Sequence, residues 1–360
     1  MSPIGVVVST RVRRLLVGAS VLVAAVALTA GSAPSRAAAS ARVGTIAFIR
    51  MAHDARIFGG RLFVIRPDGS GLRALTPPGT VEAYAWSPDG SSIAYIDRHL
   101  SLRLVRSDGT GRRLLLSTSR LSSIGLSWSP DGKEIAIASA GVNADAKTAS
   151  CASPLYVVAV DGGQPVSLRT KGGCDVAWSP RGDQIAYSRG GGIFVMRADG
   201  TGSRRVASGG GPRWSADGLQ LVFGVVIRRH GGFTLGDRYT AFGVVDADGK
   251  GFHVVTTHAY TEYAVAWSPT GRRILYGRAD SKGIYVIDAD SQDNHRIARD
   301  SPPEAGWGAL AWSPTGGSIV YTTGTSDNTD LYVIGADGRD KLRLTNTADV
   351  DIDPSWSTGS

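Results

Sequence analysis

The chain has 360 residues, of which 42% are hydrophobic and 19% are charged, and its formal net charge is +8. This apolar content excludes a disordered chain, and the 47 glycines and 16 prolines favour many short strands joined by tight turns. Neither a basic stripe nor a basic–aromatic motif occurs, which disfavours nucleic-acid binding.

Residues 1–41 have the pattern of an export signal, in which a basic start precedes an apolar run and a small-residue cleavage site. The apolar run covers residues 15–30, and the candidate cleavage sites are "AAA" at 37–39 and "ASA" at 39–41. We therefore predict export and removal of this segment, which leaves no membrane span, with an uncleaved anchor as the alternative. The sequence "RRLL" at 13–16 loosely matches a twin-arginine signal. The four arginines of the segment have no acidic counterpart, so the mature chain carries about +4.

From residue 42 onward, three short phrases recur in a fixed order, seven times each. They are a Trp-Ser pair, a strand-like phrase similar to "IAY", and a strand-like phrase that ends in most cases in Asp-Gly. The distance from the tryptophan to the first residue of the next "IAY" phrase is seven residues in all six complete cases. The tryptophans are Trp86, Trp128, Trp178, Trp214, Trp267, Trp312 and Trp356.

This constant spacing predicts β-hairpins, because a slip of one residue in register would turn every side chain to the wrong face. In the recurring sequence "SPDG", proline fixes the second turn position and glycine takes the left-handed one, and "DG" makes the next turn in the same way. A fourth strand follows, as in "RALT" at 73–76. Each repeat is therefore predicted to be a four-stranded antiparallel meander.

Radial stacking of such sheets buries both of their faces and predicts an all-β, seven-bladed β-propeller as a single domain over residues 42–360. The chain ends on Trp356-Ser357 with no following "IAY" phrase, and the first such phrase, at 46–48, has no preceding Trp-Ser pair. We predict that the C-terminal strand pairs with the N-terminal strands, which closes the ring and removes open sheet edges. The repeated tryptophans are interpreted as packing between blades.

The pattern "WSPDGxxIAY…YVxxxDGxxxxxLT" resembles the TolB-type, WD-repeat-like propeller repeat over nearly all of residues 42–360. Similar repeats occur in the periplasmic TolB protein of the Tol–Pal envelope system, in prolyl-oligopeptidase-like peptidases and in oligogalacturonate lyases. The resemblance implies a propeller but no single activity. We expect the additional N-terminal domain of TolB to be missing, and the lack of a "GxSxG" elbow disfavours a peptidase.

One rim of the predicted propeller, here named the mouth, carries the connections from second to third strands and those between repeats. Connections at the mouth vary in length while those of the opposite rim are constant, which indicates that function lies at the mouth. The long connections include 50–60 and 224–241. The candidate binding residues are His53, Arg56, Tyr84, Arg228, Arg229, His230, Asp237, Tyr239, His258, Tyr260, Trp307 and Asp351.

No catalytic residue, cofactor or metal site is predicted. The four histidines of the mouth fall on different blades without ligand spacing, so metal binding is the less favoured interpretation. Asp349, Asp351 and Asp353 alternate at the entrance of the last strand, where a regular strand would place them on one face. They could hold Ca²⁺, but they lack the glycine and the terminal glutamate of an EF-hand loop, so a turn role is preferred.

Cys151 and Cys174 are the only cysteines, and an even number in an exported chain predicts a disulfide between them. The bond would close a loop of about 24 residues and contribute roughly 3 kcal/mol in the chain-entropy model. We expect it to pin a long connection at the mouth rather than to take part in redox chemistry.

These features favour a non-catalytic, exported monomer, extracellular, periplasmic or attached to the cell envelope, that binds a protein or an envelope polymer at the mouth. The alternative is a secreted polysaccharide lyase or hydrolase, in which His53, His230 and His258 would bind metal or transfer protons. Arg228 and Arg229 would then neutralise uronate carboxylates. A purely structural scaffold is a third hypothesis.

Overall fold

The computed structural model describes residues 43–52, 59–117, 123–139, 153–228, 238–256, 262–278, 283–300, 310–325 and 327–357. All secondary-structure elements assigned in these ranges are β-strands, as the repeat pattern predicts. These ranges contain no helix with the length and apolar character needed to cross a membrane. The predicted signal, residues 1–41, lies outside the described residues.

The described residues form 28 strands, most of them four to six residues long. In chain order they are β1 (Ile46–Met51), β2 (Arg61–Ile65), β3 (Arg73–Ala74), β4 (Val81–Trp86), β5 (Ser92–Asp97), β6 (Leu102–Arg106), β7 (Arg113–Leu116), β8 (Ser123–Trp128), β9 (Glu134–Ser139), β10 (Tyr156–Ala159), β11 (Val166–Ser167), β12 (Cys174–Trp178), β13 (Gln184–Arg189), β14 (Gly192–Arg197), β15 (Arg204–Ser208), β16 (Gly210–Trp214), β17 (Gln220–Arg228), β18 (Arg238–Asp246), β19 (His253–Val254), β20 (Glu262–Trp267), β21 (Arg273–Arg278), β22 (Gly283–Asp288), β23 (His295–Ala298), β24 (Leu310–Trp312), β25 (Ser318–Thr325), β26 (Asn328–Gly335), β27 (Leu342–Arg343) and β28 (Val350–Trp356).

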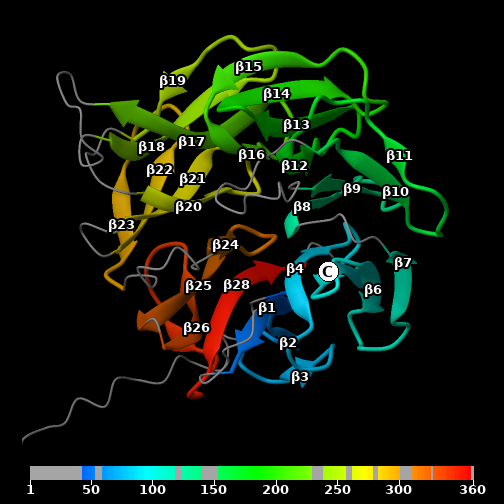
Figure 1. The fold of residues 1–360 in the computed structure, drawn as a ribbon. Helices are drawn as coiled ribbons and strands as arrows, with labels where there is room; N and C mark the ends of the chain where they lie inside the picture. The colour runs from blue at the N-terminus through cyan, green and yellow to red at the C-terminus, as the bar shows by residue number, and fades with distance from the viewer. Residues whose placement is uncertain are drawn as a thin grey trace, which may run out of the picture. The chain divides into compact units, whose positions relative to one another are not determined.

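The strands pair into five four-stranded sheets and one eight-stranded sheet (Figure 1). Each four-stranded sheet takes four consecutive strands in chain order, beginning with β4, β8, β12, β16 or β20. The eight-stranded sheet joins β24–β27 to β28, β1, β2 and β3. The two halves meet at one parallel pair, Thr329 with Val350, whereas the other strand pairs are antiparallel. Antiparallel meanders of four strands are therefore the repeating unit, as predicted.

The predicted register is confirmed by the partner of each repeated tryptophan. Trp86 pairs with Ile93, Trp128 with Ile135, Trp178 with Ile185, Trp214 with Leu221, Trp267 with Ile274 and Trp312 with Ile319. The C-terminal strand β28 pairs with the N-terminal strand β1 in the same way, with Trp356 opposite Ile46 (Figure 1). The two ends of the described chain thus share one sheet in the register of the repeat.

The first turn of six repeats has the pattern Ser-x-x-Gly, which is Ser-Pro-Asp-Gly after β4 and β8. In the turn after β4, the Gly90 N–H donates to the Ser87 carbonyl at 2.9 Å, and Gly90 has a φ of +68°. The Ser87 hydroxyl donates to Asp89 at 2.6 Å, and it accepts the backbone N–H of Ser92 at 3.0 Å. A side chain of any other residue type would be strained at the φ of Gly90, so the motif fixes turn length and register together.

Four of the tryptophans also join neighbouring sheets. In each case the indole N–H donates to the carbonyl of the residue that precedes the tryptophan of the previous repeat. These bonds are Trp86 to Ser355 (3.4 Å), Trp128 to Ala85 (3.1 Å), Trp214 to Ala177 (2.9 Å) and Trp267 to Arg213 (3.1 Å). These bonds agree with the interpretation that the tryptophans pack between repeats, and they hold neighbouring sheets together.

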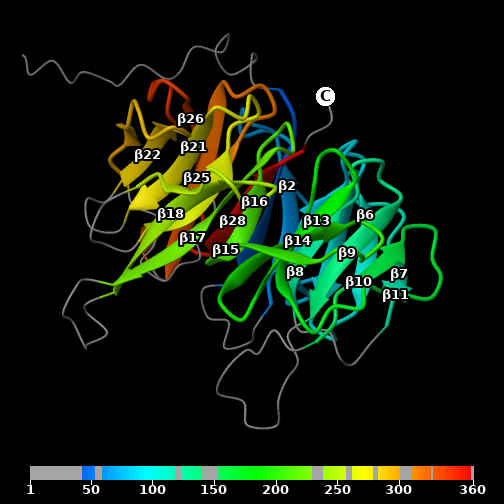
Figure 2. The same cartoon turned by 90° about the horizontal axis from the view of Figure 1, so that it is seen from above.

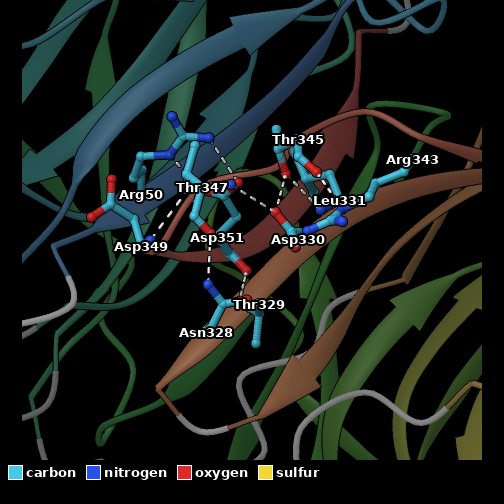
Figure 3. Close-up of polar contacts among 10 residues, drawn as sticks. All are labelled: Arg50, Asn328, Thr329, Asp330, Leu331, Arg343, Thr345, Thr347, Asp349 and Asp351. Atoms are coloured by element: carbon cyan, nitrogen blue, oxygen red, sulfur yellow. Dashed lines mark hydrogen bonds and ion pairs between the residues drawn. The ribbon is translucent and has the colours of Figure 1, made fainter.

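A polar network surrounds β28 where it lies between β26 and β1 (Figure 3). Arg50 of β1 donates two hydrogen bonds to the carboxylate of Asp351, at 2.6 and 2.8 Å, and the Asp351 side chain is fully buried. Burial disfavours the charge on Arg50, but the hydrogen bonds and the charge of Asp351 outweigh it and raise the pKa of Arg50. The Thr329 hydroxyl donates to the Asp351 carbonyl at 2.6 Å, which ties β26 to the same residue.

Candidate binding site

A cavity of about 840 Å³ is lined by residues from seven strands, the first strand of every repeat. These strands are β4, β8, β12, β16, β20, β24 and β28, whose labels lie around the centre of the view in Figure 1. A volume of this size lies within the range of small-molecule sites. Because every repeat contributes to its wall, the cavity is the main candidate for a binding site in the described part of the chain.

A β-bulge in the lining strands sets which side chains reach the cavity. In β4, β8, β12, β16, β20 and β28 the pairing register shifts within the five residues before the tryptophan. In β12 and β28 the residue three before the tryptophan is Asp175 or Asp353, and each has a φ of +50°. Aspartate is one of the few residues other than glycine that adopt this left-handed conformation, and bulges commonly redirect side chains at functional sites.

The wall of the cavity is built mostly from small, apolar and aromatic side chains, and four charged residues interrupt it: Glu82, Asp175, Arg213 and Asp353. Arg213 occupies the position directly before the tryptophan of its repeat. In the other six repeats that position is alanine or serine: Ala85, Ser127, Ala177, Ala266, Ala311 and Ser355. The arginine is therefore a departure from the repeat at one point of the wall.

Arg213 has few protein partners. Its guanidinium donates one hydrogen bond, to the Pro212 carbonyl at 3.1 Å, and forms no ion pair with any residue in the described ranges. Arg213 is exposed on the cavity wall, where partial desolvation by the surrounding protein lowers its pKa, against the attraction of the Asp175 charge. The Asp175 carboxylate itself accepts the Ser188 hydroxyl at 2.6 Å. Most of the five guanidinium N–H donors thus have no acceptor among the described residues.

Asp353 and Tyr84 form a second polar point on the wall. The Tyr84 hydroxyl donates to the carbonyls of Ala47 and Asp353, and it accepts the Ser355 hydroxyl at 3.0 Å. Burial raises the pKa of the Asp353 carboxyl to about 6, and this carboxyl makes no hydrogen bond or ion pair within the described ranges. Burial also raises the pKa of Tyr84, which therefore acts as a neutral donor at neutral pH.

The structure brings together only part of the residue set predicted for the mouth. Tyr84 lines the cavity, but its hydroxyl is engaged with backbone carbonyls. Asp351 is fully buried in the ion pair with Arg50, so it holds β28 to β1 and offers no free carboxylate to a partner. The other residues of the set lie outside the described residues or on the hairpin described next.

The connection predicted over 224–241 is shorter in the structure, because β17 and β18 both extend into this range. Strands β17 and β18 are nine residues each, and they place Arg228 opposite Arg238 and Ile227 opposite Tyr239 (Figure 2). Arg228 and Tyr239 therefore lie on strands, at the end of a hairpin that extends beyond its sheet. The predicted residues that lie outside the described residues are His53, Arg56, Arg229, His230, Asp237, His258, Tyr260 and Trp307.

The three aspartates at the entrance of β28 do not form the single carboxylate face expected of a regular strand. The bulge lies between Ile352 and Ser355, so the alternation is broken after Asp351. Asp351 pairs with Arg50, and Asp353 has the left-handed backbone that places it on the cavity wall. In the described ranges no group of three or more histidine, cysteine or acidic side chains is arranged to hold a metal ion.

Cys174 is the first residue of β12 and is buried, with 3% of its surface exposed. Its predicted partner, Cys151, lies outside the described residues, so the disulfide stays a prediction.

Sequence reasoning missed Glu82, Asp175 and Arg213, and it assigned Asp353 to a different kind of site. The signal for Arg213 was present, because aligning the seven repeats on their tryptophans exposes one arginine among alanines and serines. The contribution of the bulges was not readable, because Asp175 and Asp353 reach the cavity through a backbone conformation that spacing alone does not reveal.

Comparison with known proteins agrees with this architecture. Residues 38–299 match the family model described as the TolB beta propeller domain. TolB from Acinetobacter baumannii is similar in structure with a TM-score of 0.56 and 18% identity; the match covers 87% of this chain and 66% of that one, less than two thirds of its length. An oligogalacturonate lyase in complex with manganese is similar with a TM-score of 0.62 and 14% identity, over 80% of this chain and 90% of that one.

Hydrazine synthase from Kuenenia stuttgartiensis is also similar, with a TM-score of 0.59 and 15% identity, over 75% of this chain and 88% of that one. At these sequence identities the three similarities concern the fold alone, and the names of the three proteins describe different functions. The family match covers well over half of the chain. Because this match agrees with the sequence repeat and with the strand register, we conclude that the chain belongs to the TolB β-propeller domain family.

Proposed function

We propose that this chain is an exported, non-catalytic propeller that binds a protein or an envelope polymer at its mouth, over a cavity that runs between the repeats. The observation that carries the proposal is the cavity of about 840 Å³, to which the first strand of every repeat contributes. A concave site of this kind, framed by rigid strands and by connections of variable length, is a common arrangement for recognition.

The hydroxyl groups on the cavity wall favour binding over catalysis. The Ser127 hydroxyl accepts the Trp178 backbone N–H at 2.8 Å, and the Ser355 hydroxyl donates to Tyr84 at 3.0 Å. Tyr84 in turn donates to the Ala47 carbonyl at 2.8 Å. These groups connect the strands of the wall to one another, and a nucleophile would instead need a neighbouring base.

The proposal includes a closed ring of seven four-stranded blades. In this arrangement the eight-stranded sheet is two blades, β24–β27 and β28 with β1–β3, which touch through the single pair Thr329 and Val350. The register of Trp356 with Ile46 supports it, because it repeats the register of the six hairpins that are continuous in the chain. Closure would leave no open sheet edge for aggregation.

Export and the Cys151–Cys174 disulfide belong to the same proposal. We expect the protein purified from the medium or from the cell envelope to begin near residue 42, and a non-reduced digest to contain one peptide pair joined through the two cysteines. A cell-associated chain that retains residue 1, or two alkylated thiols, would contradict this part.

Photo-crosslinking in cells tests binding at the mouth. A photo-reactive phenylalanine in place of Tyr239 would be compared with one in place of Lys133, whose side chain is 80% exposed on the opposite rim. We expect discrete adducts from position 239 and none from position 133. Equal adducts from both positions, or none from 239 and from a second mouth position such as Tyr260, would contradict the proposal.

A polysaccharide lyase or hydrolase is the alternative function. The histidines that it would use, His53, His230 and His258, lie outside the described residues. Incubation of the purified protein with polygalacturonate, with and without Mn²⁺, distinguishes the two functions. Turnover that is lost in His230→Ala would replace the binding proposal by the enzymatic one.

A further inference from the structure

Arg213 is the feature of the cavity that packing does not explain. In six repeats the residue before the tryptophan is alanine or serine, and in three of these six its carbonyl accepts the indole N–H of the next repeat. Arg213 keeps this backbone role, since its carbonyl accepts the Trp267 indole at 3.1 Å. The repeat therefore needs only a backbone at this position, and the guanidinium is an addition to it.

The guanidinium is short of acceptors. A guanidinium has five N–H donors, and that of Arg213 makes one hydrogen bond within the described ranges, to the carbonyl of the neighbouring Pro212. Among the described residues, the charge of Asp175 attracts it, and no ion pair joins the two. Arg213 is exposed on the cavity wall, so an anion that enters the cavity can reach it and form charge-assisted hydrogen bonds with it.

The other charges of the wall limit the kind of anion. Glu82, Asp175 and Asp353 line the same cavity, and because their repulsion grows with the charge of the anion, they disfavour a doubly charged anion more than a singly charged one. The planar fork of an arginine matches the two oxygens of a carboxylate, and aromatic side chains such as Trp178 and Trp214 offer apolar surface beside it. These constraints favour a singly charged acid with an apolar body.

We propose that the cavity is a binding site for a small organic monocarboxylate, whose carboxylate is held by the Arg213 guanidinium and whose apolar part lies against the tryptophans of the wall. This inference goes beyond the proposed function, because it concerns the inside of the cavity and does not depend on the identity of a partner at the mouth. A failure of the crosslinking at the mouth would leave it untouched.

The test is calorimetric titration of the purified chain with acetate, butyrate and benzoate, and with sulfate as the doubly charged comparison. We expect the affinity to rise from acetate to benzoate and to exceed that for sulfate at neutral pH. In Arg213→Ala the affinity for benzoate should fall at least about tenfold, which is what loss of a charge-assisted, two-point contact costs. Arg112→Ala, which removes an exposed arginine outside the cavity lining, is the matched control and should leave it unchanged.

The Arg213→Ala variant should fold, because four repeats already have alanine at this position: Ala85, Ala177, Ala266 and Ala311. Its melting temperature separates lost binding from lost structure. In Arg213→Lys the charge stays but the two-point contact is lost, so binding should be intermediate. Benzoate binding of equal strength in the wild type and in Arg213→Ala, or no binding of any carboxylate to a folded wild type, would overturn the proposal.

Discussion

Two kinds of contact between neighbouring sheets occur in this molecule, although the same Trp-Ser repeat builds both. Between β28 and β4, β4 and β8, β12 and β16, and β16 and β20, an indole N–H crosses to a backbone carbonyl. On either side of β24 this bond is missing, because the indole nitrogens of Trp312 and Trp356 are buried without a partner in the described ranges. It is also missing between β8 and β12, because the Trp178 indole donates to the Gly182 carbonyl of its own turn at 3.2 Å. A constant sequence motif therefore does not give constant energetics.

The region around β24 and β28 is stabilised in another way. There β28 is joined to β1 by the buried ion pair of Arg50 and Asp351, and to β26 by the Thr329 hydroxyl (Figure 3). Asp330 of β26 in turn pairs with Arg343 of β27. A buried ion pair is costly to desolvate and adds specificity rather than large net stability. We infer that it fixes the register at the one place where no hairpin turn does so.

The largest expected effect is loss of β28. Deletion of residues 350–360 removes the strand that lies between β26 and β1 and opens two sheet edges. We expect the cooperative thermal transition to disappear, because the total stability of a native protein is only about 5–15 kcal/mol. Differential scanning calorimetry measures this, and deletion of residues 358–360 alone is the control. A truncated chain with the wild-type melting temperature would contradict the shared sheet.

The next largest effect is expected for the ion pair. Asp351→Asn leaves the Arg50 charge buried with a weaker acceptor and should lower the free energy of unfolding by about 3–5 kcal/mol. Asp337→Asn removes a surface ion pair with Arg339, in which the Arg339 side chain is 84% exposed and the Asp337 side chain 65% exposed. This substitution should change the free energy of unfolding by less than about 1 kcal/mol. Urea denaturation of the two variants gives the comparison, and equal effects would show that the buried pair has no special role.

A smaller effect concerns the pH dependence of Asp353. Its pKa in the folded chain is about 6, raised from 3.8 by burial, so the folded state binds this proton more tightly than the unfolded state does. Its contribution to stability is therefore complete below pH 3.8 and is lost as the pH rises towards 6. In Asp353→Asn this loss should be absent. Unfolding free energies of wild type and variant between pH 4 and 7 check the sign, and parallel curves would refute it.

The smallest effect separates the two kinds of contact between sheets. Trp214 and Trp312 are both 8% exposed, but of the two only the indole of Trp214 donates across to the preceding sheet. Trp214→Phe should therefore cost about 1 kcal/mol more than Trp312→Phe, the net value of one hydrogen bond. Chemical denaturation of the two variants measures the difference. The comparison fails if Trp312→Phe is the more damaging substitution.

The fold could be predicted from the sequence because its decisive signal is short in range and repeated. A spacing of seven residues from Trp214 to Leu221 is sufficient to fix a hairpin, and the incomplete repeats at the two ends correctly predicted that the C-terminal strand pairs with the N-terminal one. The site could not be predicted in the same way. The ion pair joins Asp351 to Arg50, which is 301 positions away in the chain, and no local sequence pattern predicts it. The left-handed backbone of Asp353 also breaks the two-residue alternation on which the expectation of an aspartate face depended.

The central claim is that the two ends of the chain form one cooperative sheet, and native-state hydrogen exchange of β1 and β28 tests it most directly. We predict that the amides of Ile46, Ile49 and Ile352 exchange with one common free energy, and that Asp351→Asn lowers the protection of both strands by the same amount. If β28 lost its protection in this variant while β1 and the sheet that it shares with β2 kept theirs, the claim would be contradicted.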